Sequence, residues 1–139
     1  MRTETRSGAL HRLKDSDLKL EDPRADIRGR TVKDSGGEEI GKVHDLLVDE
    51  RERKVRFLEV ASGGVLGIGQ TKILLPVETV TRIEDEVVWT NQTRETLRGA
   101  PRYDPELVEQ PYLGELYDYY GYRTPFWDAA YVYPRYPYL

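Results

Sequence analysis

The chain has 139 residues, a net charge of −4, 33% charged and 38% hydrophobic residues, and no cysteine. This length fits one ordinary domain, and no apolar run is long enough to span a membrane. The acidic balance argues against binding nucleic acid through its phosphates, and the lack of cysteine excludes disulfides, thiolate metal sites and cysteine nucleophiles.

The N-terminal segment, residues 1 to 25, is polar and mixed in charge, with scattered Leu10, Leu13, Leu18 and Leu20. This composition predicts an extended arm, with at most one short helical turn, that cannot form a core. The segment lacks the apolar stretch of a secretion signal, so we expect a cytoplasmic protein.

The central segment, residues 26 to about 100, holds nearly all the Val, Ile and Leu in short runs separated by turn residues. Such runs are typical of strands, which we expect at 30–33, 39–49, 54–60, 72–77, 79–83 and 86–90. The apolar spacing slips after Gly41, which predicts a bulge. Because no helix intervenes, the pattern predicts an all-β fold, a small antiparallel β-barrel. We expect six residues to fill it: Val55, Phe57, Leu58, Val60, Leu74 and Val87.

Two short helices are predicted after the last strand. The first covers Thr93 to Arg98 and ends at Gly99 and Pro101. The second lies at about 111–121, where apolar residues recur at helical spacing; they are Tyr112, Leu113, Leu116, Tyr117 and Tyr120. This apolar face either packs back on the barrel or binds a partner, and the pattern favours neither alternative.

Several segments resemble the PRC-barrel family, in the family's order and spacing. They are Asp26 to Gly29 with Val32, Gly41 to Val43 with Asp45 to Asp49, Val55 to Val60, Gly63 to Gly67, Leu74 to Pro76, and Thr93 to Pro101 followed by Tyr103-Asp104. In that family the domain forms the cytoplasmic body of the photosynthetic reaction-centre H subunit and the C-terminal half of the ribosome maturation factor. It also occurs in small stand-alone bacterial proteins. The segments Leu116 to Tyr120 and Phe126-Trp127 of this chain resemble the tails of those proteins. The resemblance implies a PRC barrel at 26–103, between the arm at 1–25 and a helix and extended tail at 104–139.

The glycine-rich run from Gly63 to Thr71 comes close to a phosphate-binding loop. However, Gln70 stands where that motif needs a lysine, and a strand pattern follows where a helix should begin. We therefore expect a flexible loop and no nucleotide. Its apolar residues Val65, Leu66 and Ile68 are candidate contacts for a partner.

His44, Asp45 and Asp49 invite a metal or acid–base interpretation, but strand alternation places His44 and Asp45 on opposite faces. We expect solvated edge residues here, with Asp49 beginning a turn. The acids Glu84 to Glu86 are better explained as a hairpin turn than as a calcium loop, because alternating oxygen ligands are absent. The sequence thus predicts no enzyme, no metal site and no cofactor.

The C-terminal segment, residues 101 to 139, carries all ten tyrosines and six of the eight prolines. Tyr, Trp and Arg dominate interface hot spots, and proline stiffens an extended segment. The predicted anchors for a partner are Tyr117, Tyr120, Tyr122, Arg123, Phe126, Trp127, Tyr131, Tyr133, Arg135, Tyr136 and Tyr138.

The resemblance and these anchors together predict a non-enzymatic scaffold. Its partners would be protein subunits of a larger complex, specifically a photosynthetic reaction centre at the cytoplasmic face of a membrane. Membrane contact would be only peripheral, and no direct nucleic-acid contact is expected. Two alternatives stay open: a ribosome or RNA-maturation accessory factor, and a free-standing cytoplasmic stress or regulatory protein.

Overall fold

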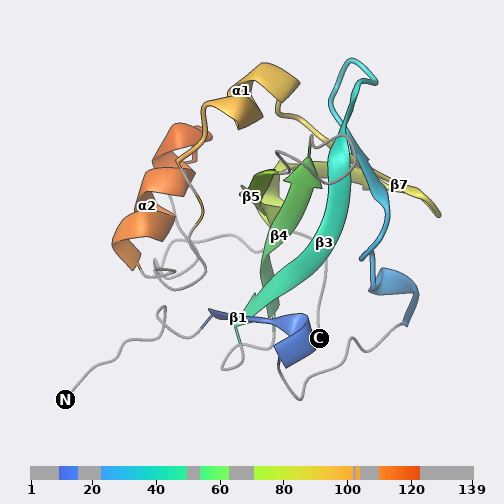
Figure 1. The fold of residues 1–139 in the computed structure, drawn as a ribbon, viewed down its shortest axis with the longest axis horizontal. Coiled ribbons are helices and arrows are strands. Elements are labelled where there is room, and N and C mark those ends of the chain that lie inside the picture. Colours follow the sequence, from blue (N-terminus) through green and yellow to red (C-terminus); the bar gives the residue numbers. More distant parts are fainter. Residues whose placement is uncertain are drawn as a thin grey trace.

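The computed structural model describes residues 10–15, 23–49, 54–62, 71–101, 103 and 110–122. The ribbon in Figure 1 shows a curved sheet with two helices along one side. The strands are β1 Leu10–Arg12, β2 Thr31–Lys33, β3 Glu39–Asp49, β4 Lys54–Ser62, β5 Thr71–Pro76, β6 Val80–Ile83 and β7 Val87–Thr90. The helices are α1 Arg94–Arg98 and α2 Gln110–Tyr119. The predicted strands and both predicted helices are confirmed, with ends that differ by at most two residues.

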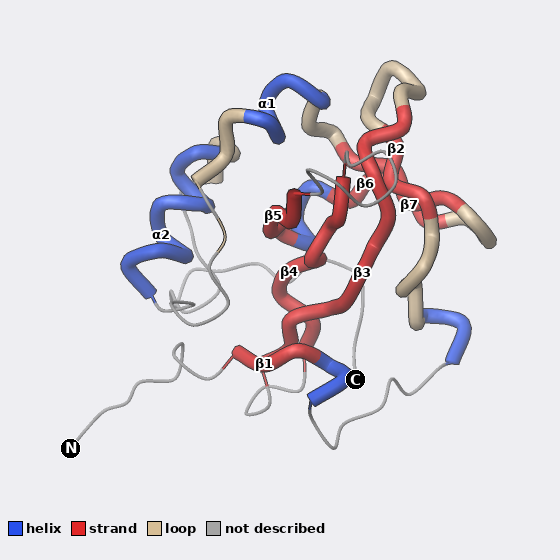
Figure 2. Tube along the Cα trace, viewed as in Figure 1, coloured by secondary structure: helices blue, strands red, loops and turns tan. Residues whose placement is uncertain are grey.

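The sheet has the strand order β5-β4-β3-β2-β7-β6, and β1 pairs with the C-terminal end of β3, whereas β2 pairs with its N-terminal end (Figure 2). This confirms the all-β prediction, with two differences. The strand order of the described residues ends at β5 and β6 instead of forming a ring, and β2 pairs with β7 in parallel. A hairpin turn fixes an antiparallel direction only for consecutive strands, whereas four strands separate β2 from β7 along the chain.

The hairpin between β2 and β3 is held by one aspartate. The backbone N–H groups of Gly36 and Glu38 both donate to Asp34 Oδ1 at 2.9 Å. Gly37 has a φ of 88°, which side chains disfavour, so glycine is needed there. The expected hairpin at Glu84 to Glu86 also connects two strands, β6 and β7.

The predicted bulge lies in β3, close to Gly41. Val43 pairs with Val60 and Asp45 with Glu59, so that His44 is an extra residue between two regular pairs. A bulge re-aims the side chain at this position.

The core contains five of the six residues that were predicted to fill it. Val55, Phe57, Leu58, Val60 and Leu74 are all at most 2% exposed. The prediction for Val87 is wrong, because Val87 is only partly buried while Val88 is fully buried. Val88 lies opposite Val32 in the parallel β2–β7 pair, and both point into the core.

The helix α2 packs on the sheet through one face. Its buried residues are Leu113, Leu116, Tyr117 and the following Tyr120. The ring centroids of Tyr117 and Phe57 lie 5.5 Å apart, which joins α2 to β4. Of the two alternatives for this face, packing on the sheet is the one observed.

The N-terminal segment also differs from the prediction. Residues 10–12 form β1, which pairs with the second half of β3, and residues 13–15 form a short 3-10 turn. Leu10 and Leu13 are buried in the main core. Composition did not predict this, because two leucines suffice when a neighbouring strand supplies the remaining apolar surface.

Candidate functional site

The most concentrated group of charges in the described chain surrounds Glu59, whose side chain on β4 is completely buried. Arg12 Nε lies 2.9 Å from Glu59 Oε1, and the Tyr103 hydroxyl donates to the same oxygen at 3.0 Å. His44 Nδ1 lies 2.8 Å from Oε2, and Lys72 Nζ is ion-paired with Oε2 at 3.8 Å. We call these five residues the Glu59 cluster.

Four separate elements bring the partners to Glu59. The pairing of β1 with β3 places Arg12 near Glu59, and the bulge in β3 turns His44 toward β4. Lys72 pairs with Ala61 across β4–β5, and Ala61 shares a face with Glu59 because residues two apart on a strand point the same way. Tyr103 follows α1, which Thr93 caps by accepting from the Thr96 N–H at 3.1 Å.

The pKa values show which groups carry charge. Burial alone would raise the pKa of Glu59, but hydrogen bonds from Tyr103 and His44 and the charge of Arg12 outweigh it, so the pKa lies below its ordinary value. Burial, reinforced by the negative charge of Glu59, raises the pKa of Tyr103 to about 12. Burial would lower the pKa of Arg12, but its interactions with the Glu59 carboxylate and with the Tyr103 side chain outweigh it and raise this pKa. At neutral pH the cluster thus holds an ionised carboxylate, a charged guanidinium and a protonated phenol.

The arrangement is suited to holding charge and not to moving protons. A general base works best when its pKa lies near the working pH, whereas the pKa of Glu59 is lowered and that of Tyr103 is raised. In the described residues, no group of three or more His, Asp or Glu side chains is placed to hold a metal ion.

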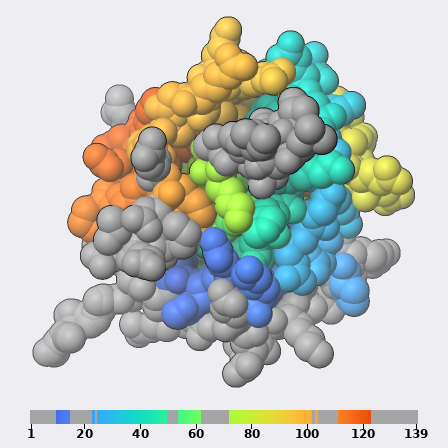
Figure 3. All heavy atoms as spheres, in the orientation of Figure 1, coloured from blue at the N-terminus to red at the C-terminus, as the bar shows by residue number. Residues whose placement is uncertain are grey.

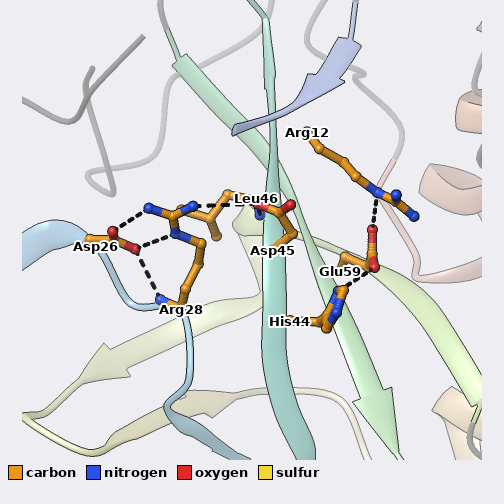
Figure 4. Close-up of polar contacts among 7 residues, drawn as sticks. All are labelled: Arg12, Asp26, Arg28, His44, Asp45, Leu46 and Glu59. Atoms are coloured by element: carbon orange, nitrogen blue, oxygen red, sulfur yellow. Dashed lines mark hydrogen bonds and ion pairs between the residues drawn. The ribbon is translucent and has the colours of Figure 1, made fainter. Parts of the chain in front are cut away.

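The opposite face of β3 carries a second, smaller group of charges. Figure 4 shows Arg28 reaching Asp26 and Asp45 on one side of β3, while His44 and Glu59 lie on the other. The predicted separation of His44 and Asp45 is therefore confirmed. The predicted solvation is confirmed for His44, whose side chain is exposed, and is wrong for Asp45 and Asp49, which are each only 1% exposed. Local alternation does not reveal that β3 is flanked by β1, β2 and β4, or that its last five residues are all buried.

Three predicted partner anchors lie in the described chain, and their hydroxyls point into the protein. The Tyr117 hydroxyl donates to Glu78 Oε2 at 3.1 Å, and that of Tyr120 donates to the Leu74 carbonyl at 3.2 Å. The Tyr122 hydroxyl donates to the Glu78 carbonyl at 3.3 Å. The other candidate contacts lie outside the described residues; they are Val65, Leu66, Ile68, Arg123, Phe126, Trp127, Tyr131, Tyr133, Arg135, Tyr136 and Tyr138.

Sequence reasoning missed the Glu59 cluster, although one signal was available. Arg56 and Glu59 are charged residues inside the run Val55 to Val60, which is otherwise apolar on both faces. A charge in such a strand is buried and must find partners. The partners themselves could not be named, because they come from β1, β3, β5 and the segment after α1.

Comparison with known families matches residues 21–97 to the PRC-barrel domain. The chain belongs to the PRC-barrel domain family. Domains of this family are non-catalytic and mediate protein–protein interaction. No curated protein matches the chain. Neither α1 nor α2 in the described residues is long and apolar enough to cross a membrane.

Proposed function

We propose that this PRC-barrel protein is a non-enzymatic scaffold subunit of a larger complex at the cytoplasmic face of a membrane, specifically a photosynthetic reaction centre. The observation that carries the proposal is the family match over residues 21–97, since the family mediates protein–protein interaction. The Glu59 cluster supports it, because its pKa values suit a fixed charge pattern and not turnover. The reaction centre as partner comes from the resemblance to the soluble part of its H subunit.

In this proposal the C-terminal segment attaches the domain to its complex. Tyr117 and Tyr120 hold α2 on the sheet, so they fix the point from which the tail starts. The aromatic anchors beyond Tyr122 then bind neighbouring subunits, each buried ring contributing about 2 kcal/mol at a hot spot. The chain clamps or caps these subunits and transfers no electrons itself.

The test is a pull-down with the tagged full-length chain from native membranes and, in parallel, from ribosome fractions. We expect membrane subunits to be recovered, and a variant that ends at Tyr122 to lose them. A variant with Ser at Asp128, Ala129 and Ala130 is the matched control, because it alters the tail but keeps its aromatics. Circular dichroism verifies that each variant keeps its fold. Recovery only with pre-ribosomal particles, or full recovery by the truncated chain, would contradict the proposal.

A further inference from the structure

The rim of the Glu59 cluster is cationic and reaches the surface. Glu59 itself is fully buried, whereas the side chains of Arg12, His44 and Lys72 are 22%, 41% and 38% exposed. Figure 3 shows atoms of β1 in blue, β3 in turquoise and β5 in yellow-green side by side on one face. The cluster therefore presents positive groups to solvent above a buried negative one.

The rim carries a surplus of positive charge. Arg12 and Lys72 each contribute one positive charge, and Glu59 balances only one of them. Lys42 adds to this face, because it is exposed and pairs across β3–β4 with Ala61, which pairs on its other side with Lys72. Directly paired residues share a face of the sheet. This local excess is notable in a chain whose net charge is −4.

Lys72 has capacity for a further acceptor. Its Nζ lies 3.8 Å from Glu59 Oε2, which is an ion pair but too long for a hydrogen bond. The two Glu59 oxygens already accept from Arg12, Tyr103 and His44. Among the described residues no hydrogen bond from the Lys72 ammonium is found. Its protons can therefore serve a second anion at the rim.

Glu59 also holds Arg12, His44 and Lys72 in place before any ligand arrives. Two cationic side chains, Arg12 and Lys72, and the imidazole of His44 converge from three strands on one carboxylate, so part of their side-chain entropy is already lost. When a ligand carboxylate binds these side chains, less side-chain entropy remains to be lost, which is the general advantage of a preorganised site.

We propose that Arg12, His44 and Lys72 form a docking site for an acidic segment of a protein partner, with one Asp or Glu carboxylate bound at the rim. This inference rests on the interaction function proposed above and specifies the partner's chemistry. An anionic membrane is a poorer match, because recognition of lipid headgroups takes a cluster of about four to eight basic residues and the whole chain is negative.

The test uses the purified full-length chain, labelled with ¹⁵N, and two synthetic peptides. One has three Glu-Glu pairs separated by Gly, and the other has Gln in place of every Glu. We expect the Glu peptide to give saturable, salt-sensitive shifts of resonances from β1, β3 and β5. Lys72→Gln should weaken binding about fivefold, the value of one partly exposed ion pair. Arg82→Gln is the matched control, because it removes one positive charge at β6, the opposite end of the strand order from β5.

Each other outcome overturns the proposal. Equal binding of the Gln peptide would show that the carboxylates do not matter. If Arg82→Gln weakened binding of the Glu peptide as much as Lys72→Gln does, the binding would reflect only general charge attraction. Binding to vesicles with 30% anionic lipid, without binding of the Glu peptide, would assign the rim to a membrane. Because purified protein is used, a failure here leaves the pull-down result standing, and a failed pull-down does not affect the peptide titration.

Discussion

Replacing Glu59 with Gln tests the central claim that a buried carboxylate holds four elements together. The substitution keeps the shape of the side chain and removes its charge. Arg12, His44 and Tyr103 each lose a charge-assisted hydrogen bond, and such a bond contributes about 1 kcal/mol more than a neutral one. Because Arg12 and His44 are partly exposed, water recovers some of this loss. We expect the free energy of unfolding to fall by about 2 to 3 kcal/mol.

Urea denaturation measures this change directly. With a slope of about 2 kcal/mol per molar, the midpoint should fall by about 1 to 1.5 M. The matched control is Glu38→Gln, whose side chain is 65% exposed and lies 4.0 Å from Arg94. An exposed pair of this kind contributes little, so the midpoint should move by less than about 0.3 M.

The dependence on pH gives the same prediction a second, independent check. The pKa of Glu59 is lowered in the folded state, so its stabilisation is present above the pKa of an unfolded glutamate, about 4.3, and disappears as pH falls through the folded pKa. The difference between the original chain and Glu59→Gln should therefore shrink below about pH 4. Equal midpoints for Glu59→Gln and Glu38→Gln, or a difference that is unchanged at pH 3, would refute the reasoning.

Three further substitutions test other contacts by urea denaturation. Leu13→Ala should cost about 2 to 3 kcal/mol, because Leu13 is 5% exposed in the core; a loss below 0.5 kcal/mol would mean that β1 and its turn do not contribute to stability. Gly99→Ala should cost about 1 kcal/mol, since the new Cβ would lie 2.6 Å from the Tyr119 hydroxyl oxygen. Adding Tyr119→Phe should restore stability, and no rescue would exclude this clash. Tyr103→Phe should lower the free energy of unfolding, and this loss should become smaller between pH 10 and about 12. The reason is that the raised pKa of Tyr103 stabilises the fold below pH 10, and this contribution is lost as pH rises through about 12. A loss of unfolding free energy that stays constant over that range would contradict the raised pKa of Tyr103.

The sequence by itself determined the strands, the turns and the family. Short apolar runs separated by residues such as Asp34 and Gly37 specify strands and hairpins locally, because side-chain alternation and positive φ act within a few residues. The same local rules predicted the bulge in β3 and both helices. They also placed His44 and Asp45 on opposite faces, as Figure 4 shows.

Only the tertiary structure decided which polar residues are buried and what surrounds them. Asp45 and Asp49 have the local pattern of solvated residues, yet both are almost completely buried in a strand that has neighbours on both edges. Leu10 and Leu13 belong to a polar segment, yet β3 gives them a surface to pack on. The parallel β2–β7 pair, which places Val88 in the core in place of Val87, joins strands that no turn connects.

The Glu59 cluster is the clearest case of this division. Arg12 and Tyr103 both bond to Glu59, from sequence separations of 47 and 44 residues. Local preferences do not extend over such distances, because these contacts form only when the sheet and the chain ends assemble together. The sequence shows that Glu59 is a charge in an apolar strand, whereas only the tertiary structure shows which residues are its partners.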